Sequence, residues 1–89
     1  MTRTGIRASA IIVKDNKILL IHRKKDGEEY WVFPGGGIEE GESPEQTVVR
    51  EIEEETSLKA INPKFAFEME TYEGGNKHPF YFVDVGKEI

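Results

Sequence analysis

The strongest structural signal in the sequence is the start of a helix at Ser43. Ser43 is a preferred N-cap residue, Pro44 falls at the first helical position, and Gln46 completes a capping box of the form S-x-x-Q. We therefore predict a helix from Pro44 to about Thr56. Strand-like segments stand on both sides of it, so the sequence predicts an α+β domain in which one helix packs on a sheet.

The segments around this helix are rich in β-branched and aromatic residues and are separated by turn residues. Residues 17–23 are apolar enough to be buried on both faces of a sheet. Pro34 and the three glycines after it are expected to end regular structure. Trp31 and the aromatic run 79–83 are assigned to packing, with a base-stacking platform as the alternative for the run. Strands are predicted at 6–14, 17–23, 30–33, 58–72 and 77–85, with a turn at residues 15 and 16 and loops at 24–29 and 73–76.

The size and charge of the chain exclude several classes of protein. Its 89 residues predict one small domain over residues 1–89, and a net charge of −5 argues against a nucleic-acid polymer or an anionic membrane as partner. There is no cysteine, which excludes disulfides and cysteine-based metal sites. No apolar run approaches the roughly 18 residues of a membrane span, and the N-terminus lacks an apolar signal core. A cytoplasmic location is the default expectation.

Negative charge is concentrated in residues 34–58, which hold eight of the 17 acidic residues and one of the 12 basic residues. On a helical wheel, Glu51, Glu54 and Glu55 share an arc of about 100° beside the predicted buried face. Partly desolvated carboxylates raise each other's pKa unless a cation neutralises them. Oxygen ligands at this spacing suit a hard cation such as Mg²⁺ or Mn²⁺. The predicted buried face comprises Val48, Val49, Ile52 and Thr56.

Two other interpretations compete with a metal site. The glutamates could form a solvated helix surface, although such surfaces usually interleave basic residues and this one offers Arg50 alone, within reach of Glu54. The "PGGG" segment at 34–37 could be a simple turn between strand and helix, although glycines also let the backbone approach a ligand closely. The combination of glycine loop and acidic helix at a fixed distance is the specific feature.

This combination resembles the Nudix box, the signature of the MutT-like pyrophosphohydrolase family, with the pattern G-x5-E-x7-R-E-U-x-E-E-x-G-U, in which U is a bulky aliphatic residue. Residues 36–58 match eight of its nine specified positions. Ser57 stands where the family has its second glycine, at a place where glycine would serve a left-handed helix cap. The matching residues are Gly36, Glu42, Arg50, Glu51, Ile52, Glu54, Glu55 and Leu58.

The resemblance implies a mixed β-sheet with the box helix packed on it, within an α/β/α sandwich. It also implies a Mg²⁺-dependent hydrolase that cleaves a nucleoside diphosphate linked to another moiety, with Mn²⁺ as an alternative ion. By position, the catalytic residues would be Arg50, Glu51 and Glu54, with Arg50 orienting a glutamate. The metal ligands would be Gly35 through its carbonyl, Glu51, Glu54 and Glu55, while Glu42 would brace the loop or reach a metal through water.

Substrate contacts and substrate class are also implied by the resemblance. Arg23 would face the phosphate or base region, with an exposed strand-end cation as the alternative, and Phe33 would line the nucleotide site, with a core position as the alternative. Tyr72 does not have the spacing associated with dinucleoside polyphosphate hydrolases, and the proline of ADP-ribose enzymes is absent, so a nucleoside triphosphate, including an oxidised one, is favoured. The implied substrate-binding residues are Arg23, Phe33, Pro34, Gly35 and Gly36.

The resemblance covers essentially the whole chain but not the closing strands and second helix of the family. The domain is therefore expected to be incomplete at its C-terminus, through truncation, a partial sequence or completion by a partner chain. An uncovered sheet face would favour a homodimer. Two functions stay open: a metal-dependent Nudix hydrolase, and a catalytically inactive nucleotide-binding or regulatory module that keeps the box.

Overall fold

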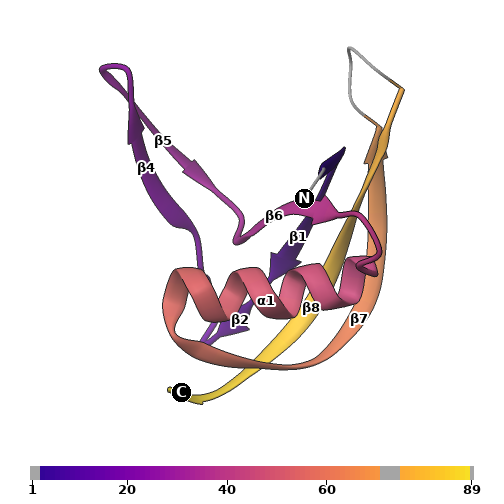
Figure 1. Ribbon diagram of the computed structural model, residues 1–89. Coiled ribbons are helices and arrows are strands. Elements are labelled where there is room, and N and C mark those ends of the chain that lie inside the picture. The colour runs from indigo at the N-terminus through magenta and orange to yellow at the C-terminus, as the bar shows by residue number, and fades with distance from the viewer. Residues whose placement is uncertain (1–2, 71–74, 89) are drawn as a thin grey trace.

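The computed structural model describes residues 3–70 and 75–88. Its single described helix crosses a sheet, and a hairpin projects away from the body (Figure 1). The element order confirms the predicted α+β class. The elements are β1 (Arg3–Ile11), β2 (Val13–Lys14), β3 (Lys17–Ile18), β4 (Ile21–Lys25), β5 (Glu28–Val32), β6 (Gly35–Glu39), α1 (Pro44–Thr56), β7 (Leu58–Glu70) and β8 (Lys77–Glu88).

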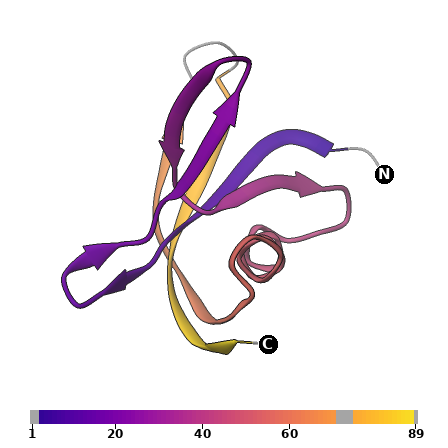
Figure 2. The same ribbon diagram turned by 90° about the vertical axis from the view of Figure 1, so that its left-hand side faces the viewer.

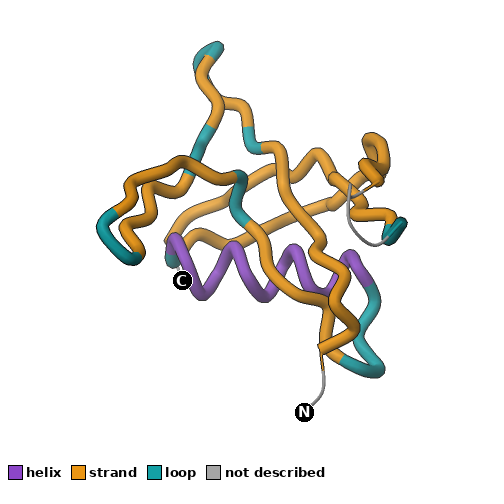
Figure 3. Tube along the Cα trace, turned by 90° about the horizontal axis from the view of Figure 1, so that it is seen from above, coloured by secondary structure: helices purple, strands orange, loops and turns teal. Residues whose placement is uncertain are grey.

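Four strands form the main sheet in the order β6-β1-β8-β7. The two central strands, β1 and β8, run parallel, with Ser9 opposite Phe80, and each edge strand is antiparallel to its neighbour. Two separate two-stranded sheets, β2-β3 and β4-β5, extend from this body. The helix lies along one face of the main sheet (Figures 2 and 3). The described sheet therefore has a helical layer on one face.

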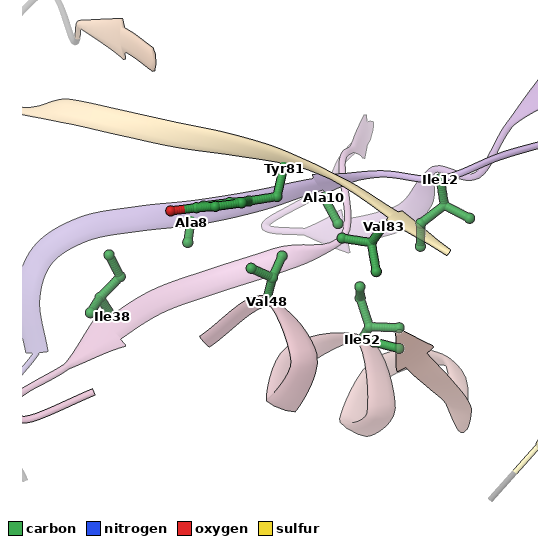
Figure 4. Packing of buried hydrophobic residues seen from close by; sticks show 9 residues of the cluster. Ala8, Ala10, Ile12, Ile38, Val48, Ile52, Tyr81 and Val83 are labelled. Atoms are coloured by element: carbon green, nitrogen blue, oxygen red, sulfur yellow. The ribbon is translucent and has the colours of Figure 1, made fainter. Parts of the chain in front are cut away.

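The core lies between α1 and the two central strands (Figure 4). Val48 and Ile52 are fully buried on the helix, as the helical wheel predicts, and Ala8 and Ala10 are fully buried on β1. Two small residues on the central strand leave room for the larger helix side chains. Burying an isoleucine or valine side chain stabilises the fold by about 1.5–3 kcal/mol, so this contact fixes the helix against the sheet. Ile12, Ile38, Ala60, Tyr81 and Val83 complete the core.

The predicted helix limits are confirmed. Ser43 accepts a hydrogen bond from the backbone N–H of Gln46, and the Gln46 side chain accepts one from the N–H of Ser43, which completes the capping box. At the other end Ser57 is left-handed, with φ 61° and ψ 15°, and its N–H donates to the carbonyl of Glu53. The left-handed cap expected at the box glycine is therefore made by a serine.

We expect Ser57→Gly to stabilise the protein by about 1 kcal/mol, because glycine adopts the left-handed region without the Cβ penalty. For a domain of this size the thermal midpoint should rise by about 4–8 °C. Circular dichroism melting curves of the two proteins measure the change. An unchanged or lower midpoint would show that the serine side chain compensates for its backbone conformation.

The N-terminal strands differ from the predicted hairpin. The turn at Asp15 and Asn16 is confirmed, and both residues have positive φ, as tight hairpin turns require. The flanking strands are short, however, and 17–23 is not one buried strand: Ile18 is 53% exposed. Residues 24–29, predicted as a loop, contain parts of β4 and β5 around a turn at Asp26 and Gly27. Charged residues pair across this hairpin, which explains its polar sequence.

Two further predictions need correction. Gly35–Glu39 is strand β6, paired with β1, and so the glycines do not end regular structure. Trp31 is 63% exposed and stacks on His22 with ring centroids 4.4 Å apart, so it does not pack in the core. In the run 79–83, Tyr81 is buried whereas Phe82 is 52% exposed, because successive strand residues face opposite sides.

Residues 71–74 lie outside the described residues, and they include Tyr72 and part of the predicted loop at 73–76. Within the described ranges, no helix has the length and apolar character needed to cross a membrane.

Candidate functional site

A polar hollow of about 330 Å³ opens where the glycine segment of β6 meets α1 and the β4-β5 hairpin. It combines two arginines with one largely buried carboxylate. Positive groups beside glycine residues, which have no side chain to block a ligand, suit an anionic ligand. The polar hollow is lined by Arg7, Arg23, Tyr30, Val32, Gly35, Gly36 and Glu51.

Glu51 enters this hollow over Gly36. A Cβ on Gly36 would lie 2.5 Å from the carboxylate carbon of Glu51, so glycine is what makes room for the carboxylate. Glu51 is 8% exposed, and its Oε1 accepts a hydrogen bond of 2.6 Å from Nη1 of Arg50. The hollow therefore contains a carboxylate whose position is fixed by the guanidinium of Arg50.

Glu55, one turn further along α1, is tied to the same glycine segment. Its Oε1 accepts from the backbone N–H of Gly35 at 3.0 Å, and its Oε2 accepts from Nη2 of Arg23 at 2.6 Å. The Glu55 side chain is 13% exposed and that of Arg23 is 43% exposed. Arg23 on β4 thereby joins the projecting hairpin to the helix, at the mouth of the polar hollow.

Arg50 and Glu42 form the strongest ion pair of the site. Arg50 donates from Nε and Nη2 to the two carboxylate oxygens of Glu42, at 2.7 and 3.0 Å, and Nη2 also donates to the carbonyl of Gly37. Thr47 and the N–H of Glu39 donate to the same carboxylate. Glu42 thus braces the loop between β6 and α1, and Arg50 positions Glu51.

These hydrogen bonds change the titration of both partners. The bonds from Arg50, more than any other contact, lower the pKa of Glu42 from 4.5 to about 2. The bond to Glu42 is likewise the main reason that the pKa of Arg50 is raised. At neutral pH both groups are therefore charged.

The pair should make stability depend on pH. Because the pKa of Glu42 is lowered in the folded state, its stabilisation is present above pH 4.5 and is lost as the pH falls toward 2. The full shift corresponds to about 3 kcal/mol, and screening near the surface reduces it to about 2 kcal/mol. We expect Glu42→Gln to lower the urea midpoint at pH 7, with the gap from wild type closing between pH 4.5 and 2. A gap that does not change with pH would contradict this origin.

An aromatic hollow of about 540 Å³ adjoins the polar hollow, and Arg7 and Val32 line both. Phe33 and Phe80 meet edge to face with centroids 5.5 Å apart, and Phe67 stacks on Phe80 at 4.7 Å. A planar apolar ligand group would find stacking surfaces here. The aromatic hollow is lined by Arg7, Ser9, Trp31, Val32, Phe33, Met69, Glu70, His78 and Phe80.

A larger depression of about 640 Å³ lies on the outer flank of α1, beside Pro63. It includes none of the glycine segment that gives Glu51 its place, and it is lined by Glu45, Gln46, Val49, Arg50, Glu53, Glu54 and Pro63. We therefore locate the candidate site at the two hollows.

Arg7, which lines both hollows, was not predicted from the sequence as a site residue. Its Nη2 donates to the carbonyl of Phe33 at 2.8 Å, and its backbone N–H donates to Nδ1 of His78 at 2.8 Å. The signal available in the sequence was an arginine between Ile6 and Ala8, at the start of a mainly apolar stretch.

Comparison with known proteins identifies the architecture. A family model described as NUDIX domain matches residues 3–88. The chain belongs to the NUDIX domain family. The RNA pyrophosphohydrolase of Psychromonas ingrahamii is 47% identical over 54 residues, 61% of this chain and 30% of that protein. The ADP-ribose pyrophosphatase of Methanocaldococcus jannaschii is 51% identical over 55 residues, 61% of this chain and 32% of that protein.

The solved structures agree on the Nudix fold. The structure from a study of MutT of Aliivibrio salmonicida and Vibrio cholerae matches with a TM-score of 0.70 and 28% identity, and covers 94% of this chain and 69% of that one. The chain spans about a third of the length of the two curated relatives. The resemblance drawn from residues 36–58 is therefore confirmed at the level of the family and the fold.

The three helix glutamates of the Nudix box that are proposed metal ligands lie in two different settings. Glu51 and Glu55 are largely buried and paired with arginines, whereas Glu54 is 60% exposed, with its Oε2 3.6 Å from Nη1 of Arg50. Among the residues that the structure describes, no three acidic or histidine side chains converge on one point suited to a metal ion. Glu51 and Glu55 both lie beside the glycine segment, and carboxylate oxygens are donors that suit a hard cation. The metal ligand set stays a prediction.

Proposed function

We propose that this Nudix protein is a pyrophosphohydrolase that cleaves a phosphoric anhydride bond of a nucleoside diphosphate linked to another moiety. The favoured substrate is a nucleoside triphosphate. The observation that carries this proposal is the polar hollow, where Glu51 sits over Gly36 between Arg7 and Arg23. A buried carboxylate and two arginines facing one small space suit a phosphate chain together with a cation.

Mg²⁺ or Mn²⁺ would be held by Glu51, Glu54 and Glu55, with the Gly35 carbonyl as a further donor. When bound, such an ion neutralises charge on the phosphate oxygens and lowers the pKa of a coordinated water. The residues of the chain supply the rest of the mechanism. Arg23 would bind phosphate oxygens. Its guanidinium pairs with Glu55, a proposed metal ligand, and so lies beside the proposed phosphate site.

Arg50 has a positioning role in this mechanism. It holds Glu51 by one hydrogen bond and is itself fixed by two bonds to Glu42, so the carboxylate of Glu51 does not have to be ordered when substrate arrives. Water attacks phosphorus and a P–O bond of the anhydride breaks, which leaves two phosphate products. One of the box glutamates would take the proton of the water.

The aromatic hollow is where we place the nucleobase. It touches the polar hollow at Arg7, so a nucleotide could span both, with its base between Trp31 and Phe33 and its phosphates beside Glu51. The sequence-based suggestion of a base-stacking platform at residues 79–83 then applies to Phe80, which lines this hollow, whereas Tyr81 belongs to the core.

The decisive experiment is a substrate panel with Mg²⁺, with release of phosphate or pyrophosphate as the measurement. The panel contains the common nucleoside triphosphates, an oxidised guanosine triphosphate, ADP-ribose and 5′-triphosphorylated RNA. We expect turnover of a triphosphate and its loss in Glu54→Gln. A folded protein that turns over no member of the panel would contradict the hydrolase, and nucleotide binding without turnover would favour the inactive binding module.

A further inference from the structure

His78 occupies an unusual position between the two central strands. It lies near the start of β8, opposite Met69 of β7, and its Nδ1 accepts a 2.8 Å hydrogen bond from the backbone N–H of Arg7 on β1. The parallel ladder between β1 and β8 begins at Ser9 and Phe80. The imidazole ring thus extends the contact between the two strands beyond the first pair of the ladder.

This hydrogen bond fixes which ring nitrogen carries the proton. A backbone N–H can only donate, so Nδ1 of His78 must be the acceptor, and the neutral ring then carries its hydrogen on Nε2. The ring also lines the aromatic hollow. The aromatic hollow is therefore lined by a polar group, the Nε2–H of His78, that can act only as a hydrogen-bond donor.

The other polar groups of the aromatic hollow differ from His78 in what they can offer. Ser9 is 4% exposed and lies beneath the surface, and Glu70 as a carboxylate can only accept. Arg7 is a donor, but one of its guanidinium nitrogens is already bonded to the carbonyl of Phe33. A base that enters between Trp31 and Phe33 would therefore meet His78 as a donor with one fixed direction, beside the remaining N–H groups of Arg7.

We propose that His78 is a specificity-determining residue, which donates its Nε2–H to an acceptor on the edge of the nucleobase and so selects bases that carry a carbonyl oxygen or ring nitrogen there. Arg7 is its positioning residue, because its backbone N–H orients His78 and its guanidinium donates to the carbonyl of Phe33, which lines the same hollow. This inference rests on the placement of the base in the aromatic hollow, which belongs to the proposed function.

The test is a binding measurement in the absence of divalent metal, so that turnover plays no part. Trp31 is the one tryptophan of the chain and lines the aromatic hollow, so its fluorescence reports a base that stacks there. The probe pairs differ in acceptors on the base edge: 7-deaza-GTP lacks only the N7 acceptor of GTP, whereas purine riboside triphosphate lacks the O6 of inosine triphosphate and has an acceptor in place of its N1–H. We expect at least one pair to differ by about tenfold in Kd, the worth of one hydrogen bond.

Two variants separate the donor from the structural role of the ring. The amide oxygen of His78→Asn can still accept from Arg7 but nothing replaces Nε2–H, so discrimination should fall to within about twofold while the thermal midpoint stays near wild type. His78→Gln places an amide near the Nε2 position and should keep part of the discrimination. Nitrogen-15 spectra of His78 should show the Nε2–H tautomer, with that proton shifted when the preferred probe binds.

The outcomes separate this inference from the proposed hydrolase. Full discrimination in His78→Asn, or a His78 ring protonated on Nδ1 alone, would overturn the role of His78 and leave the hydrolase intact. Discrimination by the wild type without turnover of any substrate would overturn the hydrolase and support His78. If no probe quenches Trp31, the base is not bound in the aromatic hollow, and the role of His78 is overturned with that placement.

Discussion

Replacing Glu51 with glutamine will lower turnover by roughly 100- to 1,000-fold, because several kcal/mol of transition-state stabilisation depend on a charged oxygen donor at this point. Glutamine keeps the size of the side chain and its contact with Gly36, but it carries no negative charge. The variant should therefore fold like wild type. Steady-state kinetics with the best substrate of the panel, together with Mg²⁺ titration, measure the loss and the weaker response to metal.

Gly36→Ala should produce a similar loss without changing the carboxylate itself. The added Cβ would lie 2.5 Å from the Glu51 carboxylate carbon and 2.7 Å from both oxygens, so Glu51 must move away from its place. Because the displaced atoms are the flexible end of a side chain, the fold should survive. A small displacement of a catalytic group can cost about a hundredfold in rate.

Glu53→Gln provides the matched control for both variants. It makes the same chemical change on the same helix, but Glu53 occupies the free position of the Nudix box pattern and is not a proposed metal ligand, although it lines the outer depression together with Glu54. Its turnover should stay within about twofold of wild type, since surface charge changes away from a site act weakly. If Glu53→Gln were as damaging as Glu51→Gln, the charge of the helix as a whole would matter, and the specific position of Glu51 would not.

Gly35→Ala should largely unfold the protein, in contrast to the neighbouring Gly36 variant. A Cβ at residue 35 would lie 2.2 Å from the carbonyl oxygen of Ala8 and 2.8 Å from the Cα of Ser9, and the residue has φ 147°. The atoms in the way are backbone atoms of the central strand β1, which cannot rotate aside. We expect a loss of about 4 kcal/mol or more, against a total stability of about 5–10 kcal/mol for a chain of this size.

The measurement is the thermal midpoint by circular dichroism, which should fall by about 15 °C or more or disappear. Gly41→Ala separates the strain of a positive φ from the steric conflict. Gly41 has φ 83°, but a Cβ added there would meet nothing within 4 Å, so its cost should be about 1–2 kcal/mol. Equal losses in the two variants would show that backbone strain, and not the contact with β1, decides the outcome.

The helix and its buried face could be predicted because their determinants are local. The Ser43 capping box and the spacing of Val48 and Ile52 act within a few turns, and the structure confirms both. The family could be predicted for the same reason, since the Nudix box is one continuous segment. These features depend on no partner far away in the sequence.

The strands and the second half of the site depend on distant partners, and there the prediction was weaker. The local preference of glycines 35–37 predicts a turn. In the fold they pair with β1 and form strand β6, and the close approach of β1 leaves no room for a Cβ at Gly35. Trp31 was assigned to packing, but its hairpin pairs apart from the main sheet. Arg7 had no visible role until the fold brought Phe33 and His78 beside it.

The parallel pairing of β1 with β8 has a consequence for how this chain acquires its structure. Arg7 and His78 are 71 residues apart, and the strands that carry them form the middle of the sheet. On a ribosome, β1 emerges long before its central partner does, and α1 has no complete sheet to cover until β8 arrives. Domains dominated by such long-range contacts fold in milliseconds to seconds. Both walls of the aromatic hollow should therefore form late, in one concerted step with the central ladder.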